Sequence, residues 1–252
     1  MGEAIESVLE DGGLLVLKIN RPERRNAISH EVMERLDEAL IRAAGDPLVK
    51  VLMITGAGNQ TFCSGGDLKE FQHLYSKEEA LSMLSKMGGI LYRLLTLEKP
   101  TIAYLNGTAV GGGCELAAAC DLRAAVPYAK AGFVQANLGI TTGWGGGSIL
   151  YEKLSVSSAH TFLLSGSLFS AAEAKGLGFI DFIDDESGKW DAFLTRLLKK
   201  ELGVLTAYKR IVAGKWEASG LKGRMDQEIL QCAKLWAEPA HHEAVKRFLK
   251  QK

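Results

Sequence analysis

The chain has 252 residues, of which 30 are basic and 30 are acidic. This balance leaves no charge excess of the kind that draws proteins to nucleic acid or acidic membranes, so a small-molecule partner is expected. The first residues, MGEAIESVLEDGG, are acidic where a signal peptide is basic and then apolar, and no apolar run reaches the length of a membrane span. These features predict a cytoplasmic protein that binds neither nucleic acid nor membrane.

The four cysteines are scattered along the chain without paired C-x-x-C spacing: Cys63, Cys114, Cys120 and Cys232. Such spacing suggests neither a zinc site nor a disulfide framework. We therefore predict buried free thiols and no bound metal.

Strand-like and helix-like patterns alternate over the first part of the chain. They predict strands at residues 7–10, 14–19, 51–55 and 101–105, and helices at residues 30–44 and 77–95. Such alternation favours an α/β architecture with parallel strand pairing. After about Gly188 only helical patterns remain, including one long segment at residues 224–250. Since no low-complexity linker intervenes, residues 1–188 are predicted to form the core and residues 189–252 a helical extension of the same domain.

Three loops contain more glycine than a turn requires: residues 56–67, 106–115 and 139–147. Glycine allows bare backbone to approach a ligand closely. The first loop begins G-x-G-x-x but has Thr61 where a dinucleotide-binding fingerprint has its third glycine. The sequence contains neither a G-x-x-x-x-G-K-[ST] phosphate loop nor a G-x-S-x-G nucleophile elbow. The dinucleotide-binding, nucleotidase and hydrolase hypotheses therefore lose their main support.

The second loop has the features of an anion site. Gly111, Gly112 and Gly113 form a glycine turn that leads into a helix, and Glu115 follows in the first helical turn. Free N–H groups at a helix start can face an oxyanion, and a carboxylate one turn away can reach the neighbouring carbon. The alternative for Glu115 is an ordinary first-turn glutamate that the helix dipole favours.

The segment NGTAVGGGCELAAACDLRAA, residues 106–125, resembles the central motif of the crotonase (enoyl-CoA hydratase/isomerase) superfamily. Four further segments match that family in the same order: RPERRNAIS, FCSGGDLKE, KPTIAYLNG and LLSGSLFSAAEAKGLGFID. The resemblance implies an α/β spiral of ββα repeats with a C-terminal helical trimerisation region. It also implies an acyl-CoA substrate, no cofactor beyond the coenzyme A of that substrate, and assembly as a homotrimer or homohexamer.

The same resemblance assigns the site residues. A thioester carbonyl would lie between the backbone N–H groups of Gly66 and Gly112, which would stabilise an enolate oxygen more than the substrate. Glu115 falls on the first catalytic glutamate of the family.

The coenzyme A contacts follow in the same way. Ser64 would lie where the family's backbone meets the adenine, and Arg24 and Arg25 where basic residues meet the phosphates. The alternative for the two arginines is a solvated turn.

The second family glutamate is replaced. Alignment on Leu138, Gly139 and Ile140 puts Gln135 at that position, and a glutamine can position a water but cannot take its proton at neutral pH. The F-V-Q and T-G-W-G-G segments and the tail LWAEPAHHEAVKRFL look like the methylmalonyl-CoA and ethylmalonyl-CoA decarboxylase branches. Single-glutamate chemistry is therefore favoured, either decarboxylation of a malonyl-type thioester or isomerisation. The alternatives are an enoyl-CoA hydratase with an atypical second acid and a non-catalytic acyl-CoA-binding paralogue.

Overall fold

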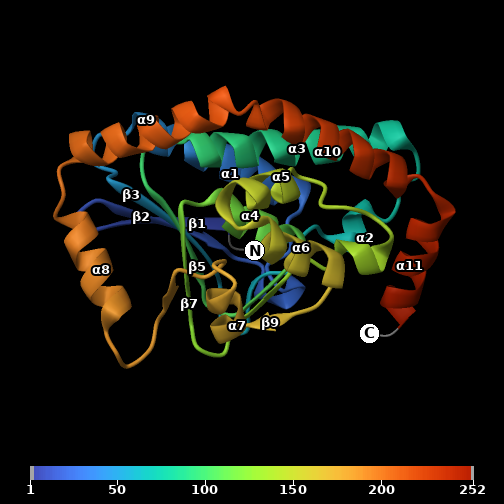
Figure 1. The fold of residues 1–252 in the computed structure, drawn as a ribbon, viewed down its shortest axis with the longest axis horizontal. Helices are drawn as coiled ribbons and strands as arrows, with labels where there is room; N and C mark the ends of the chain where they lie inside the picture. Colours follow the sequence, from blue (N-terminus) through green and yellow to red (C-terminus); the bar gives the residue numbers. More distant parts are fainter. Residues whose placement is uncertain (1–2, 251–252) are drawn as a thin grey trace.

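The computed structural model describes residues 3–250 and contains two β-sheets surrounded by helices (Figure 1). The first sheet has the strand order β1-β2-β3-β5-β7-β10, with β1 Ile5–Glu10, β2 Leu14–Ile19, β3 Val51–Gly56, β5 Thr101–Leu105, β7 Leu122–Ala125 and β10 Phe182–Ile183. The second has the order β4-β6-β8-β9, with β4 Thr61–Cys63, β6 Thr108–Val110, β8 Lys130–Gly132 and β9 Phe169–Ser170. All strands predicted from the sequence are present within one or two residues of the expected bounds.

Most neighbouring strands pair in parallel, as predicted, including β2–β3, β3–β5 and β5–β7. The exceptions are β1–β2 and β8–β9, which pair antiparallel. The first of these follows from chain length, because only the residues 11–13 join β1 to β2, and a parallel crossover needs a dozen residues or more.

The middle of the chain is a spiral of repeating units. Each unit places one strand in the first sheet and the next in the second sheet, and then forms a helical segment: β3, β4 and α2–α3, then β5, β6 and α4, then β7, β8 and η2–α5. The bounds are α2 Leu68–Phe71, α3 Lys77–Thr96, α4 Gly112–Ala119, η2 Gln135–Leu138 and α5 Gly146–Lys153. The predicted α/β spiral of ββα units is therefore confirmed.

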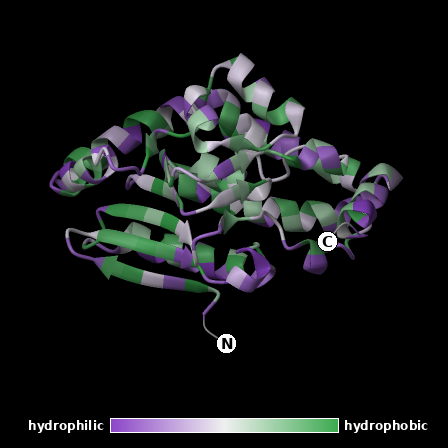
Figure 2. Ribbon diagram, turned by 90° about the horizontal axis from the view of Figure 1, so that it is seen from below, coloured by the Kyte–Doolittle hydropathy of each residue, from purple (hydrophilic) through white to green (hydrophobic). Residues whose placement is uncertain are grey.

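The core lies between the sheets and the helices. Every residue of β3 is buried. The apolar face of helix α1, His30–Gly45, is predicted from Val32, Leu36, Leu40 and Ala44; the first three are buried, whereas Ala44, in the last turn, is exposed. In Figure 2 the strands near the N-terminus are coloured mostly as hydrophobic, whereas the outer helices show mixed colours. All four cysteines are buried and free, as predicted.

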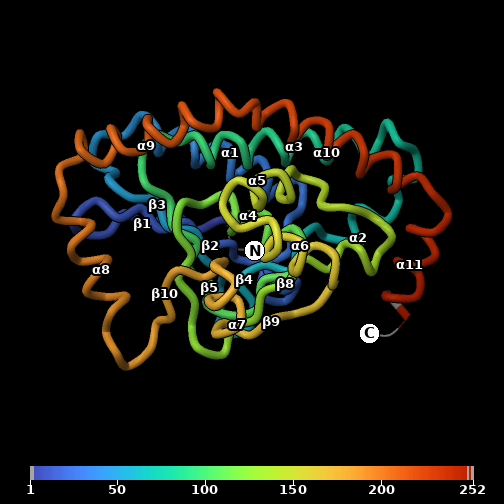
Figure 3. Tube along the Cα trace, in the orientation of Figure 1, coloured from blue at the N-terminus to red at the C-terminus, as the bar shows by residue number. Residues whose placement is uncertain are grey.

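The remaining helices wrap around the outside of this core (Figure 3). Their bounds are η1 Pro22–Arg24, α6 Val156–Ser165, α7 Ala171–Gly176, α8 Lys189–Leu198, α9 Leu202–Ala218, α10 Leu221–Trp236 and α11 Pro239–Lys250. The single long helical segment predicted at residues 224–250 is wrong, since the chain breaks between α10 and α11. Pro239 starts the new helix, where its fixed φ and missing N–H are tolerated.

Helix α10 packs along α3 and α5. Its apolar residues Ile229, Ala233 and Trp236 are buried against the core of the same chain. The division of the chain into a core, residues 1–188, and a helical extension, residues 189–252, stays a prediction. Residues 1–2 and 251–252 lie outside the part of the chain that the structure describes.

Candidate active site

The candidate site lies where three neighbouring strands of the second sheet end. Strands β4, β6 and β8 pair in parallel, so their carboxyl ends point to the same edge. Gly66 follows β4, Gly112 and Glu115 follow β6, and Gln135 follows β8. Ligands of α/β proteins bind at this edge of a sheet. The topology thus brings together four residues that the sequence assigned to one site.

Gly66 and Gly112 present adjacent backbone N–H groups. A side-chain carbon added at the neighbouring Gly65 would lie 2.9 Å from the Gly112 nitrogen, so the two turns are in contact. Gly112 begins α4, where no preceding turn supplies a carbonyl for its N–H. Gly66 and Ile28 form an isolated parallel β-bridge. Its hydrogen bonds run from the Ile28 N–H to the Gly65 carbonyl and from the Asp67 N–H to the Ile28 carbonyl, so they do not use the Gly66 N–H. Within residues 3–250 neither N–H group donates to a backbone carbonyl in a turn or loop, so the prediction that both are oxyanion donors stays open.

Helices α4 and α5 lie side by side and run in the same direction. Glu115, in the first turn of α4, accepts hydrogen bonds from the N–H groups at the start of α5. Lys153, the last residue of α5, donates to the carbonyls of Ala118 and Cys120 at the end of α4. The N-terminus of α5, with its positive dipole end, therefore points at Glu115. Burial lowers the pKa of Lys153 to about 7, and its side chain donates to the carbonyls at the end of α4.

The Glu115 carboxylate accepts four hydrogen bonds. The N–H groups of Gly143, Trp144 and Gly146 lie 3.2, 2.9 and 2.9 Å from its oxygens, and the Gln135 Nε2 lies 2.9 Å from Oε1. Glycine at position 146 permits this approach, because a side-chain carbon there would lie 2.4 Å from the Glu115 Cγ. Glu115 is therefore both buried and held in one orientation.

Burial sets the acidity of this carboxyl. It raises the pKa of Glu115 to about 7, and the negative charge of the nearby Glu228 adds to the rise. The three backbone N–H groups act in the opposite direction because they stabilise the ionised form. A carboxyl with a pKa near 7 can both give and take a proton at neutral pH, which is the property that general acid–base catalysis requires.

Gln135 lies beside Glu115 rather than on the surface. Its amide carbon and both terminal atoms lie 3.7–3.9 Å from the position that a side-chain carbon at Gly111 would occupy. Nε2 uses one of its two N–H groups for Glu115, and the buried Oε1 has no hydrogen-bond partner within residues 3–250. Oε1 can therefore accept a hydrogen bond from a ligand next to the glycine turn.

Trp144 is a part of the site that the sequence did not predict. Its indole is buried and lies against both glycines. A side-chain carbon added at Gly112 would be 2.3 Å from the six-membered ring, and one added at Gly66 would be 3.7 Å from that ring. The ring thus forms an apolar wall beside both oxyanion donors. The T-G-W-G-G segment contained the signal, but only the fold brings it to the end of β4.

The residues predicted to contact coenzyme A lie next to this centre. The Ser64 N–H donates to the Arg25 carbonyl at 3.1 Å, and Arg24 and Arg25 are exposed at the end of η1. Arg25 adopts a left-handed conformation with φ of 53°, which turns the chain toward Ser64. The backbone of Ser64, which precedes Gly66 by two residues, is thus in contact with that of Arg25.

Two buried asparagines support the glycine-rich loop after β3. The Asn26 side chain donates to the carbonyls of Ala57 and Thr61, and the Asn106 side chain donates to those of Gly56 and Gly58. The side chains thereby replace backbone partners that an irregular loop lacks. Local sequence patterns offered no signal for these long-range contacts.

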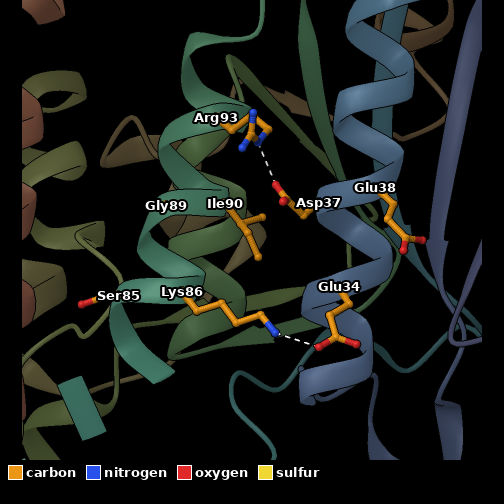
Figure 4. Close-up of a pocket in the computed structure, with 8 residues that line it drawn as sticks. All are labelled: Glu34, Asp37, Glu38, Ser85, Lys86, Gly89, Ile90 and Arg93. Atoms are coloured by element: carbon orange, nitrogen blue, oxygen red, sulfur yellow. Dashed lines mark hydrogen bonds and ion pairs between the residues drawn. The ribbon is translucent and has the colours of Figure 1, made fainter. Parts of the chain in front are cut away.

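A surface groove lies elsewhere, between α1 and α3, with a volume of about 520 Å³. Figure 4 shows that ion pairs cross it, from Lys86 to Glu34 and from Arg93 to Asp37. None of the residues predicted for the site lines this groove, and its lining charges already have partners. Within residues 3–250 no cluster of three metal-binding side chains occurs, and no described helix combines the length and apolar character of a membrane span.

Comparison with known proteins agrees with the motifs. The family model described as enoyl-CoA hydratase/isomerase matches residues 10–252. The chain is 37% identical over 169 residues to a crotonyl-CoA hydratase of Syntrophomonas wolfei, a match covering 67% of this chain and 64% of the relative. It is 34% identical over 189 residues to the mitochondrial methylglutaconyl-CoA hydratase of Mus musculus, covering 75% of this chain and 60% of that protein. The match thus spans less than two thirds of the length of either relative.

Solved structures share the fold over nearly the whole chain. An enoyl-CoA hydratase from Bacillus halodurans superposes with a TM-score of 0.87 at 22% identity, covering 97% of this chain and 99% of that one. The OdaA protein of Pseudomonas aeruginosa superposes with a TM-score of 0.84 at 28% identity, covering 98% and 99%. On the family match, the sequence relatives and the shared fold, the chain belongs to the enoyl-CoA hydratase/isomerase family of the crotonase superfamily.

Proposed function

We propose that this protein is an enzyme that acts on an acyl-CoA thioester and stabilises its enolate with the N–H groups of Gly66 and Gly112. The observation that carries this proposal is the juxtaposition of these donors with one buried, proton-exchanging carboxyl, Glu115. Each such donor contributes on the order of 3 kcal/mol to stabilising the developing negative charge. Coenzyme A would bind along Arg24, Arg25 and Ser64, and no further cofactor enters the reaction.

Within this chemistry we favour decarboxylation of a malonyl-type thioester. Cleavage of the bond between the α-carbon and the carboxylate releases CO2 and leaves the electron pair as the enolate, so no base is needed. One proton must then reach the α-carbon, and protonated Glu115 can supply it because its pKa is raised to about 7. Isomerisation is also compatible with a single carboxyl that first takes a proton and then returns it.

The apolar wall supports the same preference. The edge of the Trp144 indole that faces Gly66 and Gly112 consists of ring carbons, so a substrate carboxylate placed against these carbons gains no hydrogen bond from them. A poorly solvated carboxylate is destabilised relative to the neutral CO2 that it releases. This contact therefore favours loss of the carboxylate over its retention.

Hydration is the second candidate. Relatives of the chain are named crotonyl-CoA hydratase and methylglutaconyl-CoA hydratase, and the free Gln135 Oε1 can accept a hydrogen bond from a water. Gln135 cannot take the proton of that water, so Glu115 alone would have to activate it.

A cytoplasmic location of the protein stays a prediction.

Parallel assays of a malonyl-type thioester and crotonyl-CoA, followed by mass spectrometry, test this proposal. We expect release of CO2 from the malonyl-type thioester and slow hydration of crotonyl-CoA. Hydration with kcat in the ordinary range of about 1–10³ s⁻¹ would contradict the preferred reaction. Tight binding of coenzyme A with no turnover of either substrate would instead identify a binding protein.

We further propose that the protein assembles as a homotrimer or homohexamer through α9. This helix exposes three apolar side chains on one stripe: Val204, Tyr208 and Ile211 are 50%, 69% and 71% exposed. Contiguous exposed apolar surface of this kind marks an interface. On α10, by contrast, Ile229, Ala233 and Trp236 are buried within the chain, whereas Leu230 and Leu235 are half-buried.

Light scattering tests this assembly. The wild type should have three or six times the 27.3 kDa mass of one chain. The double variant Tyr208→Glu, Ile211→Glu should be monomeric, because two charges cannot be buried unpaired at an interface. Tyr128→Glu, which changes an exposed tyrosine away from α9, is the control and should assemble like the wild type. A monomeric wild type at micromolar concentration would refute the proposal.

A further inference from the structure

Glu228 of α10 binds the same turn of backbone that holds Glu115. Its Oε1 accepts from the Gly147 N–H at 2.9 Å, and its Oε2 accepts from the Ser148 N–H at 2.7 Å. Glu115 accepts from the preceding N–H groups, including that of Gly146. The N-terminus of α5 therefore carries two carboxylates, one from the candidate site and one from the C-terminal helices.

Glu228 also closes the turn on its other side. The Thr142 hydroxyl donates to Glu228 Oε1, and the Gly147 N–H lies 3.2 Å from the Thr142 hydroxyl oxygen. One side chain thus fixes both ends of the segment 142–148. That segment supplies three donors to Glu115 and carries the Trp144 ring.

The charge of Glu228 acts on Glu115 without compensation from a cation. Among the described residues no lysine, arginine or histidine lies within ion-pair distance of Glu228, whereas Glu152 on the same helix α5 pairs with Lys215 and Arg224. A negative charge nearby disfavours ionisation of a carboxyl, and Glu228 is the charged group that raises the pKa of Glu115.

Other titratable groups near Glu115 do not supply this charge. They are Cys114 on its own helix and Cys232 on α10. Burial raises the pKa of both thiols well above neutrality, so both are uncharged at pH 7. The remaining neighbours of the Glu115 carboxylate are the Gln135 amide and backbone N–H groups. Glu228 is therefore the remaining electrostatic partner.

We propose that Glu228 is a positioning residue that holds the 142–148 turn, with its three N–H donors and the Trp144 ring, against Glu115. The carboxylate that it places beside the turn is then the group whose charge acts on Glu115. This inference rests on the proposed role of Glu115 in proton transfer. It links the C-terminal helices to the chemistry, because the residue that tunes the proton-transfer group lies on α10. Protonated Glu115 is the form that a decarboxylation needs for its final step.

The test is a ¹³C NMR titration of the glutamate carboxyls, with Glu115 assigned by its loss in Glu115→Gln. In the wild type Glu115 should titrate near 7. In Glu228→Gln its pKa should fall by about one unit, because the like charge is removed. The basic limb of the pH–rate profile, where Glu115 loses its proton, should move by the same amount in Glu228→Gln. Turnover that needs protonated Glu115 should therefore fall about fivefold at pH 7 in this variant and stay unchanged at acidic pH.

Three further variants separate charge from structure. Glu228→Asp keeps the charge but shortens the reach, so the pKa of Glu115 should stay near that of the wild type. Gln231→Lys places a cation one turn from Glu228 along α10 and leaves the contacts of Glu228 in place. Like Glu228→Gln, it should lower the pKa of Glu115. Glu152→Gln, which removes a carboxylate already paired with two cations, should leave it unchanged.

The outcomes are distinct. An unchanged titration of Glu115 in both Glu228→Gln and Gln231→Lys overturns the proposal, as does an equal shift in Glu228→Asp and Glu228→Gln. Because the titration needs no turnover, a protein that converts no thioester but shows the predicted shifts would refute the proposed function and leave the positioning role intact.

Discussion

Replacing Glu115 by glutamine should lower kcat by a factor of about 10²–10⁴, the usual contribution of a positioned proton-transfer group. The amide is similar in size to the carboxyl but cannot donate a proton to carbon. KM should change little, because the predicted coenzyme A contacts and the Gly66 and Gly112 donors are not altered. Turnover of the preferred thioester over a range of concentrations gives both values.

The pH dependence of the wild type follows from the same group. With a pKa raised to about 7, Glu115 loses its proton as the pH rises through neutrality. If it acts as the acid of a decarboxylation, turnover should fall as the pH rises through about 7. If it acts as a base in hydration or isomerisation, turnover should instead fall as the pH drops through that value.

The Glu115→Gln variant needs a check on folding. The new amide group would face N–H donors where the carboxylate accepted four hydrogen bonds, which costs stability. A thermal melt and the affinity for coenzyme A should therefore be measured alongside kcat. Wild-type turnover in a folded variant would show that another group moves the proton.

Replacing Gln135 by glutamate should raise crotonyl-CoA hydration by on the order of 10²-fold, because it restores the second carboxyl of a hydratase. The new carboxyl would lie next to Glu115, since the present amide nitrogen is 2.9 Å from its Oε1. Two carboxyls at this distance share a proton, so one would be an acid and the other a base at neutral pH. Water addition needs both roles.

The same change should leave decarboxylation unchanged or reduce it. A second negative charge in a buried site repels the carboxylate of a malonyl-type substrate. Asn137→Asp is the matched control, because it adds the same charge two residues away, where the native side chain donates to the Gly166 carbonyl instead of Glu115. A gain in hydration in the control, or none in Gln135→Glu, would contradict the assignment of position 135.

The sequence predicted the elements whose patterns are long enough to read. Helix α1 buries three of the four residues of its predicted face, Val32, Leu36 and Leu40, and β3 is a fully buried strand. The strands that build the site, β4, β6 and β8, have only three residues each, too few for a periodic pattern. The glycine motifs and the family resemblance indicated their place instead.

Local sequence could not identify the partners that act over long separations. The four donors to Glu115 come from residues 135–146, and Glu228 comes from a helix near the end of the chain. Glu115 does lie in the first turn of α4, as the alternative interpretation expects, but the backbone N–H groups that bind its carboxylate lie at the start of α5. Such contacts arise from the packing of α4 against α5 and are not a property of either segment alone.

The central claim is that this site forms a thioester enolate and that Glu115 delivers one proton to its α-carbon. Mass spectrometry of the product formed from a malonyl-type thioester in D2O tests this most directly. We predict a decarboxylated acyl-CoA that carries one deuterium at the α-carbon, formed at least 10²-fold more slowly by Glu115→Gln. A malonyl-type thioester left intact, while crotonyl-CoA is hydrated at an ordinary enzymatic rate, would contradict the account.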